Sequence, residues 1–567
     1  MPRRLKAAAI VCVVAALVIF VLLPPATRRT EPPPATTVRG AFHIHSERSD
    51  GSGSVEDIAA AAARAGLQFI ILTDHGDATR TPDAPAYRSG VLVLDGVEIN
   101  TSAGHYAVID LPASPYPLAG TASEVIEDVT RLGGFGFVAH PGSPRPALSW
   151  RDWDAPIGGL EWINADSEWR DEPRLPLARA LITYLFRAPQ SMAKLLDRPT
   201  AVLEKWDALA RTRRIVGLAA ADAHARLGVQ QRTDPDYSAI HVPLPDYESS
   251  FRAFSNHVVL AGPLGGDAAA DARRLSSAIR EGRVYSVIDA LASPGALTFT
   301  AHSGSQSATL GGTLPIAGDV LLRASVSAPP GTSLVLLRDG QRVYEVTDGP
   351  LEMNGGVEPA VYRVEAYTAN APGGPAVPWI VSNPIYAGLG HAATLVQEPP
   401  APTSRIPART SEAAGESGPN DTSTVVAAAL DDARARTFAG DPAIMWTFSL
   451  SPGTPAGQYA AVRVPVTGGL AAIDRIRFMA SAAAPMRVWV QLRAPVGNTE
   501  RWGATFYTGT DARLIDIPFS KFRAIGVTSS ALPPLDQVDS ILFVVDTLNT
   551  LPGTKGSMTI SEVGLVK

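Results

Sequence analysis

The stretch Phe42-His43-Ile44-His45 decides the interpretation of the first half of the chain. It ends a short apolar run, Val38–His45, that we expect to form a strand. Side chains alternate between the two faces of a strand, so His43 and His45 should point to the same side. Two imidazoles spaced in this way can share one metal ion. Asp50 follows in a Ser-Asp-Gly turn that can fold its carboxylate back over the same place.

Predicted strands and helices alternate from residue 38 to about residue 289. Runs rich in Val, Ile and Phe predict strands at 38–45, 67–72, 90–99, 105–111, 134–140, 159–163 and 214–220, and Ala-rich stretches predict helices at 55–65, 122–132 and 192–211. Ser54 with Asp57 and Thr121 with Glu124 can cap two of these helices. The alternation predicts an α/β fold with a mainly parallel sheet, of which a barrel is one form.

Imidazole and carboxylate side chains gather at the predicted strand ends. Six of the ten histidines lie at such an end or within a few residues of it. In a βα architecture the carboxyl ends of the strands form the site. A single such residue is more often structural or caps a helix, but several in sequence predict a metal cluster for zinc, manganese or iron. The predicted ligands are His43, His45, Asp50, His75, Glu98, His105, His140, Asp222 and His224.

This order of residues resembles the PHP superfamily, which is named for polymerase and histidinol phosphatase domains. The matching stretches are 42–46, 49–51, 72–75, 96–98, 139–142 and 222–224, and the resemblance spans about residues 38 to 290. It implies a distorted, TIM-like (βα)7 barrel with two or three divalent metal ions at its mouth. It further implies a first ion held by His43, His45, Glu98 and Asp222, a second by Glu98, His105 and His140, and a third by Asp50, His75 and His224.

The resemblance implies a phosphatase or phosphodiesterase that uses metal-activated water, with Glu98 and Asp222 as catalytic ligands. A bound metal ion lowers the pKa of water toward about 7, which provides a nucleophile at neutral pH. Arg48, Arg145 and Arg226 lie near predicted ligands and could clamp a phosphate, although each is as readily a solvated surface arginine. Two alternatives stay open: a metal-dependent hydrolase of another ester or amide bond in a cell-surface polymer, and a non-catalytic carbohydrate- or surface-binding protein.

Other polar residues near the predicted site have weaker interpretations. Asp74 is expected to orient a ligand histidine or to cap its loop. Asn164 ends another predicted strand and at most lines the pocket. The remaining histidines match no ligand position and are interpreted as surface or packing residues: His241, His257, His302 and His391.

The second half of the chain is predicted to be β-rich. Short alternating strands indicate an immunoglobulin-like β-sandwich at 291–390, a Pro/Ser/Thr-rich linker at 391–424 and a jelly roll of galactose-binding type at 425–567. Aromatic residues such as Trp489, Trp502 and Tyr507 could stack on sugar rings, although alternating aromatics in a sandwich are more often core. Carbohydrate is therefore a candidate partner of the last domain.

The first 37 residues have the pattern of a targeting segment followed by a spacer. Arg3, Arg4 and Lys6 precede an apolar run from Ala7 to Leu23, at the short end of the roughly 17–25 residues that span a bilayer. We predict a membrane-spanning signal anchor, with a cleavable signal peptide as the alternative. The remainder would then lie outside the cytoplasmic membrane, anchored or secreted. A net charge of -6 gives no indication of a nucleic-acid partner, and the single cysteine, Cys12, excludes an intrachain disulfide.

Overall fold

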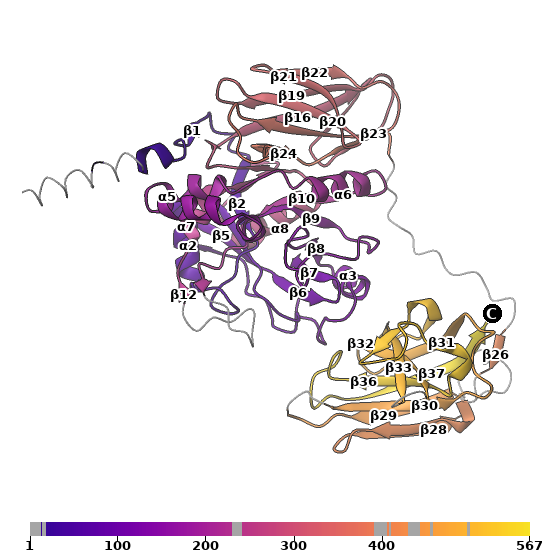
Figure 1. The fold of residues 1–567 in the computed structure, drawn as a ribbon. Coiled ribbons are helices and arrows are strands. Elements are labelled where there is room, and N and C mark those ends of the chain that lie inside the picture. Colours follow the sequence, from indigo (N-terminus) through magenta and orange to yellow (C-terminus); the bar gives the residue numbers. More distant parts are fainter. Residues whose placement is uncertain are drawn as a thin grey trace, which may run out of the picture. The chain divides into compact units, whose positions relative to one another are not determined.

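The computed structural model describes residues 13, 19–228, 241–389, 405–407, 410–428, 443–453, 457–495 and 499–567. The chain divides into two compact units (Figure 1). The first comprises residues 1–113 and 120–394, and the second comprises residues 114–119 and 395–567.

The predicted membrane-spanning segment requires a correction. Within the part of the chain that the structure describes, no helix is long and apolar enough to cross a membrane. Of the apolar run, only residues 13 and 19–23 are described, and the helical turn at 19–22 is far shorter than the roughly 20 residues that a bilayer requires. Residues 1–12, which include Cys12, and residues 14–18 lie outside the described residues.

The first sheet of unit 1 begins with three parallel strands that carry the first predicted ligands at their ends. β2 (Thr37–Phe42) pairs with β3 (Phe69–Leu72), and β3 pairs with β5 (Val91–Asp95). Antiparallel pairs extend this core on both sides: β13 (Ser255–Val259) pairs with β2, β14 (Val284–Val287) pairs with β13, and β4 (Ala86–Arg88) pairs with β5.

The second sheet contains five strands in the order β10-β9-β8-β7-β6. β10 (Val216–Ala220), β9 (Gly159–Asn164) and β8 (Phe135–Val138) are parallel to one another. β7 (Gly104–Ile109) pairs antiparallel with β8, and β6 (Val97–Thr101) pairs antiparallel with β7. Both sheets are thus mixed rather than mainly parallel. In the second sheet the reason is the short turn at residues 102–103, which joins β6 directly to β7 as an antiparallel neighbour. The predicted strand 90–99 is divided at Gly96, where an added Cβ would lie 2.4 Å from the carbonyl oxygen of Val108.

The two sheets meet at the ends that carry the predicted ligands. Single parallel bridges join Ile44 to Ala223 and His75 to Glu98. Between the sheets lies a buried apolar cluster to which Phe42, Phe137 and Leu275 contribute from the first sheet, the second sheet and α8 (Ala268–Arg280) respectively. The assignment to a closed (βα)7 barrel stays a prediction.

Helices flank the sheets and confirm both predicted caps. The Ser54 side chain accepts a hydrogen bond from the Asp57 amide, and Thr121 with Glu124 forms a capping box. The predicted helix 192–211 is wrong at its start, because Pro199 cannot continue a helix and precedes a new one. The helices of this part are α2 (Val55–Arg64), α3 (Ala122–Arg131), α4 (Ala165–Arg170), α5 (Arg174–Ala193), α6 (Thr200–Ala210) and α7 (Tyr247–Ala253).

The β-sandwich of residues 291–389 shares a sheet with the α/β part. β14 pairs with β24 (Ile380–Ser382), so one twelve-stranded sheet runs from β4 to β18 through both parts. Figure 1 shows the remaining sandwich strands stacked on one side of the α/β part. They are β16 (Ala296–Ser303), β17 (Gln306–Thr309), β18 (Thr313–Leu314), β19 (Leu321–Ser327), β20 (Ser333–Arg338), β21 (Gln341–Thr347), β22 (Leu351–Asn354), β23 (Ala360–Tyr367) and β25 (Ile385–Ala387). Two short pairs form separate sheets: β1 (Arg28–Arg29) with β15 (Ala292–Ser293), and, within the α/β part, β11 (Leu227–Gly228) with β12 (His241–Val242).

The second unit consists of two six-stranded antiparallel sheets around one core. Its first strands lie inside the stretch predicted as a linker, of which residues 391–404 are outside the described residues. Trp502 is fully buried in the core, which removes it from a sugar-binding surface; carbohydrate binding by this unit stays a prediction. The strands are β26 (Arg405–Pro407), β27 (Ala414–Ser417), β28 (Thr422–Ala428), β29 (Ala443–Ser449), β30 (Tyr459–Pro465), β31 (Arg475–Ala482), β32 (Met486–Ala494), β33 (Glu500–Thr508), β34 (Arg513–Pro518), β35 (Arg523–Ile525), β36 (Ser540–Asp546) and β37 (Lys555–Val566).

Candidate metal centre

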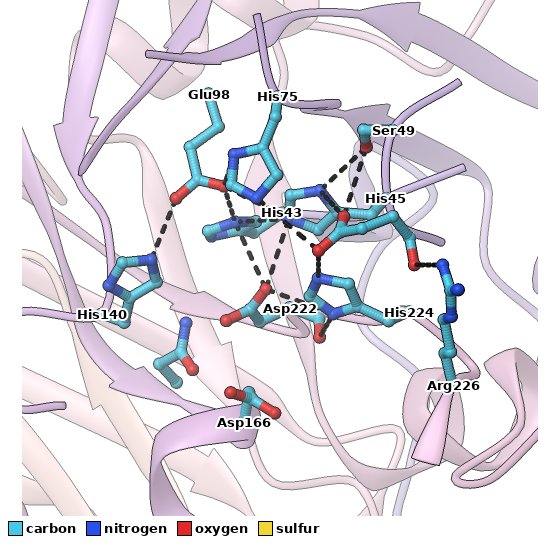
Figure 2. A network of polar contacts seen from close by, with 12 residues as sticks. His43, His45, Ser49, His75, Glu98, His140, Asp166, Asp222, His224 and Arg226 are labelled. Atoms are coloured by element: carbon cyan, nitrogen blue, oxygen red, sulfur yellow. Dashed lines mark hydrogen bonds and ion pairs between the residues drawn. The ribbon is translucent and has the colours of Figure 1, made fainter. Parts of the chain in front are cut away.

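The structure brings all nine predicted ligands together where the two sheets meet. Figure 2 labels His43, His45, His75, Glu98, His140, Asp222 and His224 among them. Seven of the side chains come from the loop that follows a strand, whereas Glu98 and His105 lie at the second positions of their strands. His43, His45 and Asp50 follow β2, His75 follows β3, Glu98 lies in β6, His105 in β7, His140 follows β8, and Asp222 and His224 follow β10. We call this set the metal-ligand cluster.

The backbone at three members of the cluster adopts the left-handed region. The φ angles are +64° at His43, +32° at His140 and +42° at Asp222. Non-glycine residues rarely adopt such angles, and they concentrate at functional sites. β2 ends at Phe42, so His43 and His45 lie beyond the strand in which their side chains were expected to alternate. A turn after the strand, and not strand alternation, directs His43 and His45 into the same place.

Glu98 is the centre of the cluster and is 1% exposed. Its Oε1 atom lies 2.9 Å from Nδ1 of His105 and 2.9 Å from Nε2 of His140. Its Oε2 atom faces a different set of imidazoles, at 3.2 Å from His43, 3.3 Å from His45 and 3.3 Å from His75. Each carboxylate oxygen therefore belongs to a separate group of nitrogen donors, as in a carboxylate that bridges two cations.

Two aspartates complete the cluster. Asp222 Oδ1 lies 3.4 Å from Nε2 of both His43 and His45. Asp50 approaches His45 at 3.2 Å with one oxygen and His224 at 3.2 Å with the other.

Four groups of three residues have donor atoms within 4.8 Å of one another, close enough to surround an ion. They are His43/His45/Glu98, His45/Asp50/His75, His45/Asp222/His224 and His75/Glu98/His105. These imidazole and carboxylate donors fit zinc, manganese or iron.

The electrostatics of the cluster favour positive charge. Burial lowers the pKa of His43, but the carboxylates of Glu161, Asp222 and Glu98 outweigh it and raise that pKa well above its ordinary value. Burial raises the pKa of Glu98, but neighbouring imidazoles, chiefly His43 and His75, hold it well below its ordinary value. The pKa of Asp222 is also held well below its ordinary value, by His43 and His45 against the effect of burial. Buried carboxylates that stay ionised among imidazoles provide the negative charge that divalent cations require.

A cavity of about 160 Å³ opens above the cluster. Arg145, Arg170 and Arg226 line it together with Trp169 and the apolar side chains of Leu148, Met192 and Leu244. The Arg226 guanidinium donates to the carbonyl oxygen of Asp50 at 3.3 Å (Figure 2). A cavity with cation ligands on its floor and arginines on its walls suits an anionic substrate.

Comparison with known protein families gives a match to residues 41–128. The PHP domain family matches residues 41–128, which contain six of the nine clustered side chains. This segment is a PHP domain. No curated protein matches the chain.

Two solved structures have low similarity to the chain. One is a two-domain protein from Bacteroides vulgatus that contains a predicted PHP-like metal-dependent phosphoesterase; it is 14% identical, covers 64% of this chain and 98% of its own, and has a TM-score of 0.28. The other is the family 11 carbohydrate-binding module of a cellulosomal cellulase from Clostridium thermocellum; it is 16% identical, covers 29% of this chain and 96% of its own, and has a TM-score of 0.23.

The arginines near the metal-ligand cluster differ in position. Arg145 and Arg226 line the cavity as expected for groups that contact a substrate. Arg48 lies beside a separate cavity, where it forms ion pairs with Asp83 and with Asp95. It is therefore an unsuitable phosphate clamp. Arg170, which the sequence analysis missed, stacks over Trp169 at 4.4 Å and pairs with Asp166.

Two further carboxylates support the PHP site. Asp74 accepts hydrogen bonds of 2.7 Å from the amide of Ser46 and from the hydroxyls of Ser46 and Ser49, so it caps the loop that leads to Asp50. Glu161, which the sequence analysis missed, contacts His43 from the buried side. Its only sequence signal is a charged residue in the middle of an otherwise apolar strand.

The remaining histidines lie in elements that do not contribute to the cluster or outside the described residues. His257 lies in β13 and is fully buried, and burial lowers its pKa well below the ordinary value. His302 lies in β16. His391 and the side chain of His241 are outside the described residues.

Glu168 of α4 is expected to make the protein less stable as the pH rises. Burial, with Asp171, Asp197 and Glu172 nearby, raises its pKa to about 8, although the Asp197 amide donates to it. The folded protein therefore retains a proton that the unfolded chain loses near its ordinary value of 4.5, and stability falls between these pH values. We expect Glu168→Gln to be more stable than the wild type by roughly 4 kcal/mol at pH 8 and equal to it near pH 4.

Urea unfolding of both proteins across this pH range tests the prediction. All other groups titrate in both proteins, so their contributions cancel in the difference between the two free energies of unfolding. A difference that does not change with pH would contradict the buried, protonated state of Glu168.

Proposed function

We propose that this chain is a metal-dependent hydrolase that cleaves phosphoesters with a multinuclear metal centre. The observation that carries the proposal is the position of Glu98, whose two carboxylate oxygens face two separate sets of imidazoles. When bound, divalent ions would supply a water nucleophile at neutral pH and neutralise the charge that develops at phosphorus.

Three groups of residues would hold the ions. His43 and His45 face Oε2 of Glu98 and have Asp222 beside them, whereas His105 and His140 face Oε1. A third group comprises Asp50, His224 and His75, in which Asp50 lies 3.2 Å from His224 and 3.7 Å from His75. Zinc, manganese and iron all fit these donors.

Arg145 and Arg226 would bind the phosphoryl oxygens from the cavity walls. We expect Arg226→Ala to raise KM for a phosphoester about 10-fold and to change kcat much less, since one charge-assisted hydrogen bond contributes roughly 1.5–3 kcal/mol. Arg48→Ala is the matched control, because Arg48 pairs with aspartates beside another cavity. Steady-state kinetics of both variants would contradict this role of Arg226 if the two KM values are equal.

Metal analysis of the purified full chain, followed by a phosphoester screen, tests the proposed function. We expect bound divalent metal, hydrolysis of p-nitrophenyl phosphate or bis(p-nitrophenyl) phosphate, and loss of both after treatment with a chelator. Bound metal with hydrolysis of carboxylic esters or amides alone would favour the other hydrolase hypothesis. Absence of metal in the wild-type protein would overturn the enzyme assignment.

We also propose that the chain acts outside the cytoplasm. The support is the basic and then apolar composition of residues 3–23. A reporter active only after export, fused behind residues 1–37, tests this location directly. A fusion protein that is made in full but shows no reporter activity would contradict it.

A further inference from the structure

Glu161 is a buried carboxylate that contacts two members of the metal-ligand cluster. It lies in β9 between β8 and β10, and it is 1% exposed. One of its oxygens, Oε1, contacts Nδ1 of His43. The other, Oε2, accepts hydrogen bonds from the backbone amide of His140 at 2.6 Å and from the side-chain amide of Asn164 at 2.8 Å.

We infer that Glu161 is a positioning residue that holds His43 in the tautomer that binds metal. A neutral imidazole carries one N–H, and its other nitrogen has the free lone pair. Because Nδ1 of His43 faces the Glu161 carboxylate, that nitrogen carries the proton. The lone pair is then on Nε2, which faces Glu98 Oε2 at 3.2 Å and Asp222 Oδ1 at 3.4 Å. This inference rests on the metal centre proposed above.

Other cluster histidines are oriented by the main chain. His140 Nδ1 lies 3.1 Å from the carbonyl oxygen of Leu148, and His224 Nδ1 lies 2.9 Å from the carbonyl oxygen of Asp222. A carbonyl oxygen only accepts, so both rings also present Nε2 to the site. His43 depends on a side chain for the same orientation. Since Glu161 also holds the backbone of His140, one carboxylate positions ligands that face opposite oxygens of Glu98.

Glu161→Gln provides a specific test because glutamine has one acceptor and one donor group. If its oxygen keeps the bonds to His140 and Asn164, its NH₂ group faces Nδ1 of His43. The proton of His43 must then move to Nε2, which blocks metal binding there. If the amide is reversed, its NH₂ group faces two N–H donors instead. Either orientation disturbs the cluster with almost no change in side-chain volume.

We expect the full-length Glu161→Gln protein to bind Mn²⁺ or Zn²⁺ about 10- to 100-fold more weakly than the wild type, the range typical of carboxylates that orient a ligand histidine. Chelator competition on the metal-free proteins measures this affinity without any substrate. We expect excess metal to restore binding. Glu168→Gln is the matched control, because it removes a buried carboxylate of α4 that has no contact with the cluster; it should bind metal like the wild type.

Wild-type affinity in a folded Glu161→Gln protein would overturn the inference, whereas a wild-type chain that binds no metal would overturn the proposed function instead. If Glu161→Gln does not fold, a second measurement decides. Long-range ¹H–¹⁵N spectra of the zinc-loaded wild type, with His43 assigned by its loss in His43→Gln, should show a protonated Nδ1 on that ring. Coordination of zinc through Nδ1 would overturn the inference.

Discussion

Replacing Glu98 with glutamine is expected to lower kcat/KM for phosphoester hydrolysis by roughly 10³-fold, equivalent to about 4 kcal/mol of transition-state stabilisation. The reason is that both oxygens of Glu98 are in use, with imidazole nitrogens 2.9 Å from one and 3.2 Å from the other. Glutamine removes the negative charge, and its NH₂ group must face one of these two sets of donors. Metal content and steady-state kinetics of the same preparation measure the effect.

Glu204→Gln is the control for this substitution. Glu204 is exposed on α6, so its replacement should leave both metal content and kcat/KM within about twofold of the wild type. A Glu98→Gln protein that retains full metal content and most of its activity would show that Glu98 does not bridge ions. Loss of metal without loss of hydrolysis would indicate that hydrolysis does not require the cluster.

The cluster could be predicted from the sequence because its members lie close to strand termini in a recognisable order. Local signals were enough for these residues and for the Ser54 and Thr121 caps. Glu161 could not be predicted in the same way, because its partners His43 and His140 are 118 and 21 residues away. Such a contact depends on the strand order β8-β9-β10, which no local pattern encodes.

The convergence of His43 and His45 was predicted, but the predicted cause, alternation of side chains along a strand, was wrong. Strand alternation places side chains only within the strand, and β2 ends before His43. The φ angle of +64° at His43 belongs to a turn, and such an angle is set by tertiary contacts rather than by the residue type. The division of 90–99 at Gly96 has a similar origin, since only a glycine allows the backbone of Val108 so close.

The sequence also separated two parts that the structure joins. The change in pattern near residue 291 predicted a new domain, yet β24 pairs with β14 in one sheet. Asn383, next to β24, both donates to and accepts from the backbone of Gly217 in β10 at 2.8 Å. β10 leads to Asp222 and His224, so the sandwich supports the strand that carries these two ligands. Strand pairing across such a boundary leaves no trace in composition.

A buried ion network strengthens this connection. Arg363 of β23 is 1% exposed and binds Asp207 of α6 with two hydrogen bonds, of 3.0 and 2.7 Å. Its Nη1 atom donates to Glu365 at 2.6 Å. Burial raises the pKa of Glu365, but Arg363 and Arg198 outweigh it and lower that pKa to about 2. The guanidinium groups of Arg363 and Arg198 therefore compensate the two carboxylates in a place with little access to water.

We expect Arg363→Met to destabilise the first unit by about 3–5 kcal/mol, because the buried Asp207 loses its cation and Glu365 keeps only its pair with Arg198. Calorimetry of the full-length protein should show the loss, and metal release should move to the same lower temperature. Arg342→Met is the matched control: its pair with Glu345 is largely exposed and should contribute about 0–1 kcal/mol. Adding Asp207→Leu to Arg363→Met should recover part of the loss, since it removes one uncompensated charge. If metal release keeps its wild-type temperature in Arg363→Met, the sandwich and the metal centre unfold independently.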